Sequence, residues 1–228
     1  MKSSNEWINI SDLMSVLMMV FLFISVLYMY EVQKEQKSIE LIATSYKDTN
    51  ENIQQSMQKI FKNNLQKWSA DIKEDNRIVF FSPDVVFKTN KTNVASKFKI
   101  ILDDFFPQLI KVLNDEKIKD EIAEIRIEGH SNKQWANKDK DGYIGNMSIS
   151  QQRALEVLQY CISIDKPIIK NNKKWLQSKL IAVGMSYSKP YIENNTTNWT
   201  KSKRVEFKIV TKSKDKLFEI LEKIKSIK

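Results

Sequence analysis

The chain has few of the residues on which disulfide frameworks and catalytic sites depend. Its 228 residues include one cysteine, Cys161, and one histidine, His130. A single cysteine excludes an intrachain disulfide, and its apolar neighbours predict a buried thiol. We expect His130 to form hydrogen bonds that shape a loop. Without a second histidine, a cysteine cluster, a nucleophile motif or a glycine-rich phosphate loop, the sequence indicates neither an enzyme, a metal site nor a cofactor.

Charge is absent from Leu13 to Tyr30. At 1.5 Å per residue this run forms about 27 Å of helix, close to a hydrocarbon core of about 30 Å. It is too long for the apolar part of a cleavable signal, and no small-residue cleavage site follows. We predict a retained transmembrane helix over 12–30 after a cytoplasmic tail over 1–11. The bulk of the chain would then lie outside the inner membrane.

Asp12 stands at the head of this run. If Trp7 and the pair Tyr28/Tyr30 mark the interfaces, Asp12 lies about 7.5 Å inside the first one. An ionised carboxylate there costs about 2.5–3.5 kcal/mol or more, which favours an ion pathway. The alternative is that Asp12, or Ser11 before it, caps the membrane helix.

Proline and glycine are absent between Val32 and Ile72, which predicts a helical linker over 31–75. Apolar residues follow a seven-residue repeat with gaps, at Val32, Ile39, Ile42, Tyr46, Ile53 and Ile60. This repeat favours a parallel coiled coil with a second copy. A lone helix lying on the following domain is the competing interpretation.

The remainder predicts an α+β domain, a small mixed sheet with helices on one face. Expected strands are 77–81, 122–128, 179–183 and 205–210, with a short strand or loop at 85–87. Expected helices are 95–113, 148–163 and a charged amphipathic helix at 213–228. We expect Pro107 to kink or divide the first of these helices.

The net charge of +9 raises the question of nucleic acid. The lysines are scattered, however, and a domain outside the membrane rarely meets DNA. We expect no nucleic-acid partner and interpret the charge as a solvated surface, facing acidic groups of the cell wall or of lipids.

Two blocks of sequence resemble known families. The segment Ile10-Ser11-Asp12-Leu13-Met14-Ser15-Val16-Leu17-Met18-Met19 resembles the membrane helix of MotB-like stator B subunits, with the acid in register. The second block comprises Ile127-Glu128-Gly129-His130-Ser131-Asn132, Asn146 to Ala154, Gly184-Met185-Ser186 and Lys203-Arg204-Val205-Glu206. It is similar to the OmpA-like peptidoglycan-binding domain, which we place at 76–212.

The resemblance implies a homodimer inside a pentameric ring of a MotA-like or ZorA-like membrane subunit. In that family Asp12 would take up a proton or a sodium ion, and Ser15, one turn along, would ligate the ion or pack. The resemblance also implies that Asn132, Asn146, Ile149, Arg153 and Arg204 bind peptidoglycan. An amide at position 132 replaces the family's aspartate and loses its charge pair with the diaminopimelate ammonium.

Arg153 would act from the first turns of its helix, where backbone donors favour a carboxylate. An insertion at 133–143, the long linker and the extra C-terminal helix resemble the B subunit of the Zorya anti-phage defence motor more than a plain flagellar subunit. Flagellar use and a passive envelope tether without ion conduction are the alternatives.

Overall fold

The computed structural model describes residues 3–81, 93–133 and 142–212, in two compact units. The described part of the first unit ends at Ser45, and the second runs from Tyr46 to Lys212. The expected strand at 85–87, most of the insertion at 133–143 and the C-terminal helix 213–228 lie outside the described residues.

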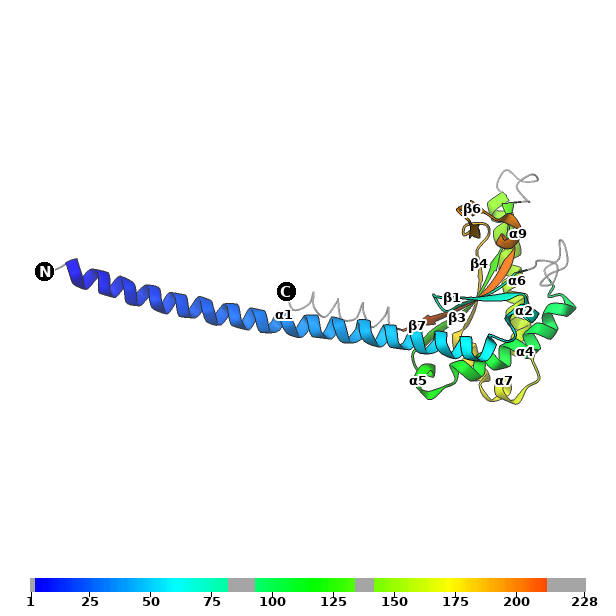
Figure 1. The fold of residues 1–228 in the computed structure, drawn as a ribbon, viewed down its shortest axis with the longest axis horizontal. Coiled ribbons are helices and arrows are strands. Elements are labelled where there is room, and N and C mark those ends of the chain that lie inside the picture. Colours follow the sequence, from blue (N-terminus) through cyan, green and yellow to red (C-terminus); the bar gives the residue numbers. More distant parts are fainter. Residues whose placement is uncertain (1–2, 82–92, 134–141, 213–228) are drawn as a thin grey trace. The chain divides into compact units, whose positions relative to one another are not determined.

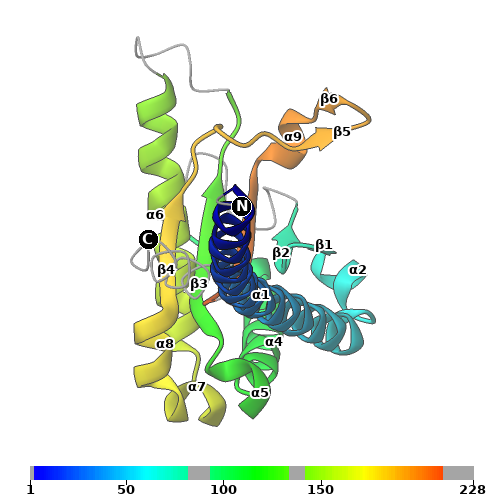
Figure 2. The ribbon, with the colours of Figure 1, turned by 90° about the vertical axis from the view of Figure 1, so that its left-hand side faces the viewer.

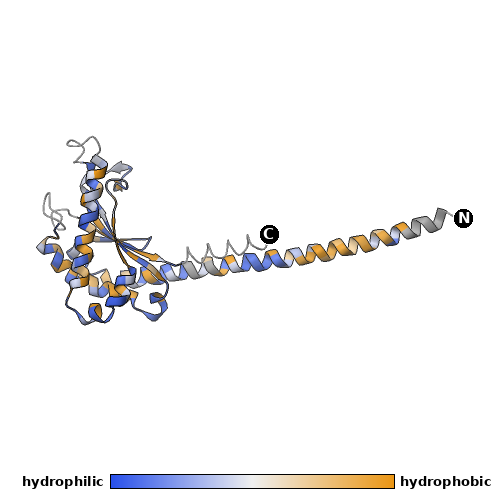
Figure 3. Cartoon of the chain, turned by 180° about the vertical axis from the view of Figure 1, so that it is seen from behind, coloured by the Kyte–Doolittle hydropathy of each residue, from blue (hydrophilic) through white to orange (hydrophobic). Residues whose placement is uncertain are grey.

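The first unit is the N-terminal part of helix α1, Ser3–Phe61. Within the described residues, the segment Ile10–Leu41 is long and apolar enough to cross a membrane, with a mean hydropathy of 2.3 in its most apolar window. None of the residues in that window is buried in the structure, and Figure 3 shows a hydrophobic stretch of α1 there. A helix that exposes apolar residues all round requires an apolar environment or protein partners.

The second unit is a five-stranded sheet in the order β1-β2-β7-β3-β4. The strands are β1 Ala70–Lys73, β2 Arg77–Phe80, β3 Ile122–His130, β4 Leu180–Gly184 and β7 Arg204–Thr211. The helices are α2 Leu65–Trp68, α4 Ser96–Leu113, α5 Glu116–Lys119, α6 Gly142–Ser163, α7 Pro167–Asn171, α8 Lys173–Lys179 and α9 Trp199–Ser202, with the small hairpin β5 Ile192–Glu193 and β6 Thr196–Thr197. Strands β3 and β4 are parallel and the other neighbours in the sheet are antiparallel, which confirms a mixed sheet (Figures 1 and 2).

The two faces of the sheet differ in chemistry because side chains alternate along each strand. Ile125, Ile127 and Phe207 point toward α4 and α6 and are buried. Phe207 lies 5.0 Å from Phe105 of α4 between ring centroids. The opposite face carries charged residues from β1, β2, β3 and β7, among them Arg204 and Glu206.

The linker prediction was wrong in two respects. The helix ends at Phe61, and Ala70–Lys73 forms β1, paired with β2. The last turns of α1 also belong to the core, since Ile53, Met57 and Phe61 are fully buried. Here the lone helix lying on its own domain is the correct interpretation, whereas the pairing of residues nearer the membrane stays a prediction.

Pro107 neither ends nor divides α4, which runs from Ser96 to Leu113. A proline removes only one backbone hydrogen bond, and the neighbouring Phe105, Phe106 and Leu109 are fully buried. Their packing holds the helix together across the proline.

Candidate functional site

Asp12 lies within α1, nine residues after the helix begins at Ser3. The capping interpretation of Asp12 and Ser11 is therefore wrong, because neither residue stands at the start of the helix. The Ser15 hydroxyl donates a hydrogen bond of 2.9 Å to the Ser11 carbonyl. Asp12 is exposed on a helix whose following residues are apolar.

The second site lies where β3 and β4 end beside α6. Two glycines allow α6 to lie close against these strands. A Cβ on Gly129 would lie 2.2 Å from the Ser150 carbonyl oxygen, and a Cβ on Gly184 would lie 2.7 Å from the Gln151 backbone nitrogen. The Gln151 side chain accepts from the Gly184 N–H at 2.6 Å and donates to the Ala182 carbonyl at 3.1 Å. The helix is thereby fixed to the edge strand.

Ser186 connects the two loops beyond these strands with α6. Its carbonyl accepts from the Ser131 N–H at 2.8 Å, and its N–H donates to the Ser150 hydroxyl at 2.9 Å. Its own hydroxyl donates to the Tyr143 carbonyl at 2.9 Å. These bonds hold the loop that carries Asn132 against the N-terminal half of α6.

Three of the predicted wall-binding residues share one face of α6. Asn146, Ile149 and Arg153 follow each other at spacings of three and four residues. Asn146 is buried and its amide donates to the Gly142 carbonyl at 2.7 Å, whereas Ile149 is half-buried. Asn132 is also buried, and it follows Ser131 in the loop that Ser186 connects to the first turn of α6.

The expectation that Arg153 lies in the first turns of its helix is wrong. Helix α6 starts by Gly142, so Arg153 lies eleven residues further on, beyond the first turns whose free donors attract anions. The side chain is half-buried, and burial lowers the pKa of its guanidinium. Any binding of an anion by Arg153 must depend on its own charge and fork of donors.

The fifth residue, Arg204, lies elsewhere, at the start of β7 on the charged face of the sheet. Its Nε donates to Glu206 Oε1 at 2.5 Å, and its other nitrogens donate to the carbonyls of Ser202 at 3.2 Å and Lys189 at 3.1 Å. Arg77 bonds the second oxygen of Glu206 at 2.9 Å. The Glu206 carboxylate is therefore held by two guanidinium groups.

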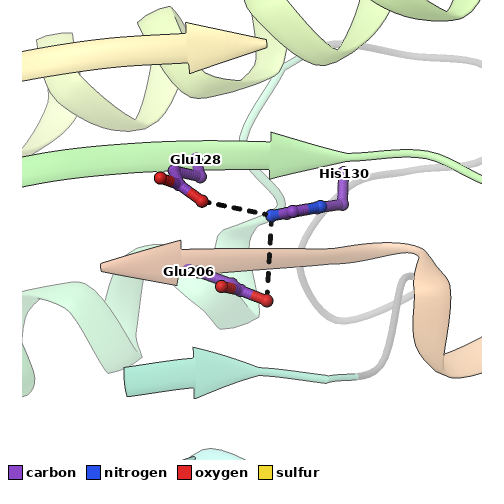
Figure 4. Close-up of side chains that lie close together, drawn as sticks. All are labelled: Glu128, His130 and Glu206. Atoms are coloured by element: carbon purple, nitrogen blue, oxygen red, sulfur yellow. Dashed lines mark ion pairs between the residues drawn. The ribbon is translucent and has the colours of Figure 1, made fainter. Parts of the chain in front are cut away.

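Glu128 and His130 of β3 lie next to Glu206 of β7 on this face of the sheet (Figure 4). His130 Nε2 lies 3.6 Å from Glu128 Oε2 and 3.7 Å from Glu206 Oε1, and all three residues are buried. The expectation that His130 forms hydrogen bonds is wrong, since neither ring nitrogen has a partner within hydrogen-bond distance in the described chain. Burial, assisted by the charge of Arg204, lowers the pKa of His130 against the opposing effect of the two carboxylates.

Burial alone would raise the pKa values of Glu128 and Glu206, but the interaction with His130, together with Lys208 for Glu128 and Arg204 for Glu206, lowers both overall. The two glutamates are direct cross-strand partners, an arrangement that repels unless cations intervene. The three side chains are also of the kinds that bind metal ions, and each offers one ligand atom within 4.8 Å of the other two. A divalent ion would have to compete with two guanidinium groups for Glu206, so we interpret the group as a buried ion network.

Sequence reasoning missed Glu128, Glu206 and Arg77 as parts of this network. The signal was present in the alternation of β3 and β7, where charged residues occupy every second position. Alternation alone indicates a solvated face, and only the pairing of β3 with β7 shows that this end of the face is buried.

Comparison with known proteins gives similarity over most of the chain. Residues 86–204 match the OmpA family. The Zorya protein ZorB of Escherichia coli is 37% identical over 225 residues, covering 97% of this chain and 94% of the relative. The uncharacterized protein YtxE of Bacillus subtilis is 27% identical over 241 residues, covering 93% and 91%. A MotB-like protein from Desulfovibrio vulgaris has a solved structure with a TM-score of 0.42 and 20% identity, covering 78% of this chain and 98% of that one.

Proposed function

The chain belongs to the ZorB family and to the OmpA family, and from this premise we propose that it is the ion-conducting B subunit of a rotary membrane motor in anti-phage defence. One observation carries the proposal. A single carboxylate, Asp12, lies at the start of an exposed apolar helix segment that is long enough to cross a membrane. A carboxylate inside the hydrocarbon region costs free energy, and a helix that serves only as an anchor does not need one.

In the proposed mechanism Asp12 alternates between a charged and a neutral form. Uptake of a proton, or close pairing with a sodium ion, removes its net charge and lets it face apolar surroundings. Contact with water restores the carboxylate. Each charge that crosses the membrane releases about 2.3 kcal/mol per 100 mV, which can drive rotation. Ser15 would position the adjacent turn of α1.

The assembly that fits this mechanism is a homodimer inside a pentameric ring of a MotA-like or ZorA-like subunit. The resemblance of the Asp12 segment to stator B subunits supports this arrangement. In the proposed orientation the N-terminus is cytoplasmic, α1 crosses the inner membrane once, and Tyr46–Lys212 lies on the outer side.

The compact second unit would anchor the motor to peptidoglycan. Asn132, in the loop after β3, and Asn146, Ile149 and Arg153, on one face of α6, would receive the peptide stem. Asn132 keeps an acceptor oxygen but has no charge for the diaminopimelate ammonium, so Arg153 would contribute most of the ionic part of binding. Arg204 would act mainly by holding Glu206.

Two other functions fit part of the observations. The segment around Asp12 also fits a flagellar stator B subunit, and a single span with an OmpA domain fits a passive cell-wall tether. The tether does not use the charge of Asp12, and the flagellar subunit would restore motility rather than resistance to phage.

Asp12→Asn separates a motor from a tether. In cells with the complete set of motor genes, we expect the variant to copurify with the ring subunit and to lose phage protection. Asp48→Asn, an exposed acid further along α1, is the matched control and should keep protection. Full protection with Asp12→Asn would favour the tether, and rescue of a motility mutant by the unchanged chain would favour the flagellar function.

A further inference from the structure

A pocket lies on the charged face of the sheet, apart from the predicted wall-binding residues of α6. It has a volume of about 280 Å³ and is lined by residues of β1, β2, β7 and the segment that leads into β5. Its charged lining consists of Lys73, Arg77, Lys189, Arg204 and Glu206. Four cations therefore face one carboxylate.

The pocket stays positive when the neighbouring acids are included. Asp71 contacts Lys73 at 2.5 Å, and Asp75 contacts Arg77 at 2.6 Å. With Glu206 and its cross-strand partner Glu128, four carboxylates face the four lining cations and Lys208, which interacts with Glu128, so one positive charge remains in excess. Lys189 is exposed, so its ammonium can reach a ligand.

Part of the pocket is held rigidly before any ligand arrives. Arg204 is buried and fixed by its bonds to Glu206, Ser202 and Lys189. The backbone of Tyr191 is held on both sides, because its N–H donates to the Ser202 hydroxyl at 2.9 Å and its carbonyl accepts from the Asn198 N–H at 2.8 Å. A fixed pocket loses less entropy on binding.

Tyr191 forms an aromatic wall surrounded by cations. Lys73 lies 5.7 Å, Lys201 5.8 Å and Arg204 5.9 Å from the centre of its ring. Pro190 and Val79 add apolar surface to the lining. The combination suits an anionic group carried on a small apolar body, rather than a bare ion.

The volume limits the size of that body. Sites for whole drug-sized ligands begin at about 300 Å³, so this pocket fits an end group of a larger molecule. Peptidoglycan stems end in D-alanine, whose carboxylate and methyl group match the cations and the apolar wall. We propose that this pocket is a second wall-binding subsite that takes the terminal D-alanine carboxylate of a peptide stem. The assignment rests on the proposed anchoring function.

Titration of the full-length protein in detergent micelles tests the subsite. The probes are N-acetyl-D-alanyl-D-alanine, its C-terminal amide and inorganic phosphate, with binding measured by calorimetry. We expect the acid to bind and the amide to bind at least about tenfold more weakly, since a charge-assisted contact is lost. Lys189→Glu should weaken binding of the acid about tenfold, and Lys174→Glu, the same change on exposed Lys174 of α8, should leave it unchanged.

Equal binding of acid and amide, no binding of the acid, or an equal effect of the two lysine variants would overturn the subsite. Binding of phosphate as tight as that of the acid would overturn its assignment to a carboxylate. Cosedimentation with purified sacculi tests the anchoring function separately. Lack of sacculus binding by the unchanged chain would contradict anchoring, whereas sacculus binding without binding of the acid would contradict only the subsite.

Discussion

Arg204 and Glu206 form a buried ion pair between neighbours on the same face of β7, with Nε and Oε1 2.5 Å apart. Arg126 and Glu124 repeat this geometry on β3 at 2.6 Å, but their side chains are 40% and 32% exposed, compared with 4% and 1% for the β7 pair. The same contact thus occurs in two environments within one sheet.

We predict that Arg204→Gln lowers the free energy of unfolding by about 3 kcal/mol, because it leaves a carboxylate buried with one partner fewer. Arg126→Gln is the control and should cost less than about 1 kcal/mol, since water replaces its partner. Denaturant unfolding of the full chain, followed by tryptophan fluorescence, measures both. Similar losses in the two variants would contradict a burial-dependent role for Arg204.

The elements of the second unit were largely predictable, but their partners were not. The alternation around Ile125 and Ile127 correctly predicted β3 and its apolar face. The apolar stripe through Ile53 and Ile60 correctly predicted helix, yet a stripe does not specify what covers it. Ile53 packs into the chain's own core, whereas Ile60 remains 36% exposed.

The site was predictable to a similar degree. The resemblance implied that Asn132, Asn146, Ile149 and Arg153 bind peptidoglycan, and the structure places three of them on one face of α6 and Asn132 in the loop tied to its first turn. It did not separate Arg204 from them, because the sequence does not show that β7 directs this side chain to the opposite face of the sheet. The start of α6 at Gly142 was missed because the preceding polar insertion has no apolar periodicity.

His130 should make stability depend on pH. Its folded pKa is lowered from an ordinary value of 6.5, so the unfolded chain binds the proton first as the pH falls. The stability from neutral His130 is complete above pH 6.5 and is lost as the pH falls toward the folded pKa. We expect the free energy of unfolding to fall by up to about 1.4 kcal/mol per pH unit below pH 6.5.

The chain has one histidine, so His130→Gln isolates this effect in protein without a histidine tag. The variant should show a smaller change in the free energy of unfolding between pH 7.5 and 5.5 than the unchanged chain. An unchanged slope in His130→Gln would assign the pH dependence to other groups.

Gly129 should not tolerate a side chain. A Cβ there would lie 2.2 Å from a backbone oxygen of α6, and backbone cannot move aside as a flexible side chain does. We predict that Gly129→Ala lowers the free energy of unfolding by about 3 kcal/mol and weakens sacculus binding, because α6 must shift from β3. Gly145→Ala, inside α6, is the control and should stabilise by up to about 1 kcal/mol. Equal stability of the two variants would contradict the close packing of α6 on β3.

Ion flux through the reconstituted complex tests the central claim most directly. The complex of this chain with its ring subunit is placed in liposomes, a membrane potential is imposed, and proton and sodium uptake are recorded for the unchanged chain, Asp12→Asn and Asp48→Asn. We predict flux of one of these ions with the unchanged chain and with Asp48→Asn, and a loss of about a hundredfold or more with Asp12→Asn, which cannot alternate between charged and neutral forms. Equal flux with Asp12→Asn would contradict an ion-carrying role for this residue.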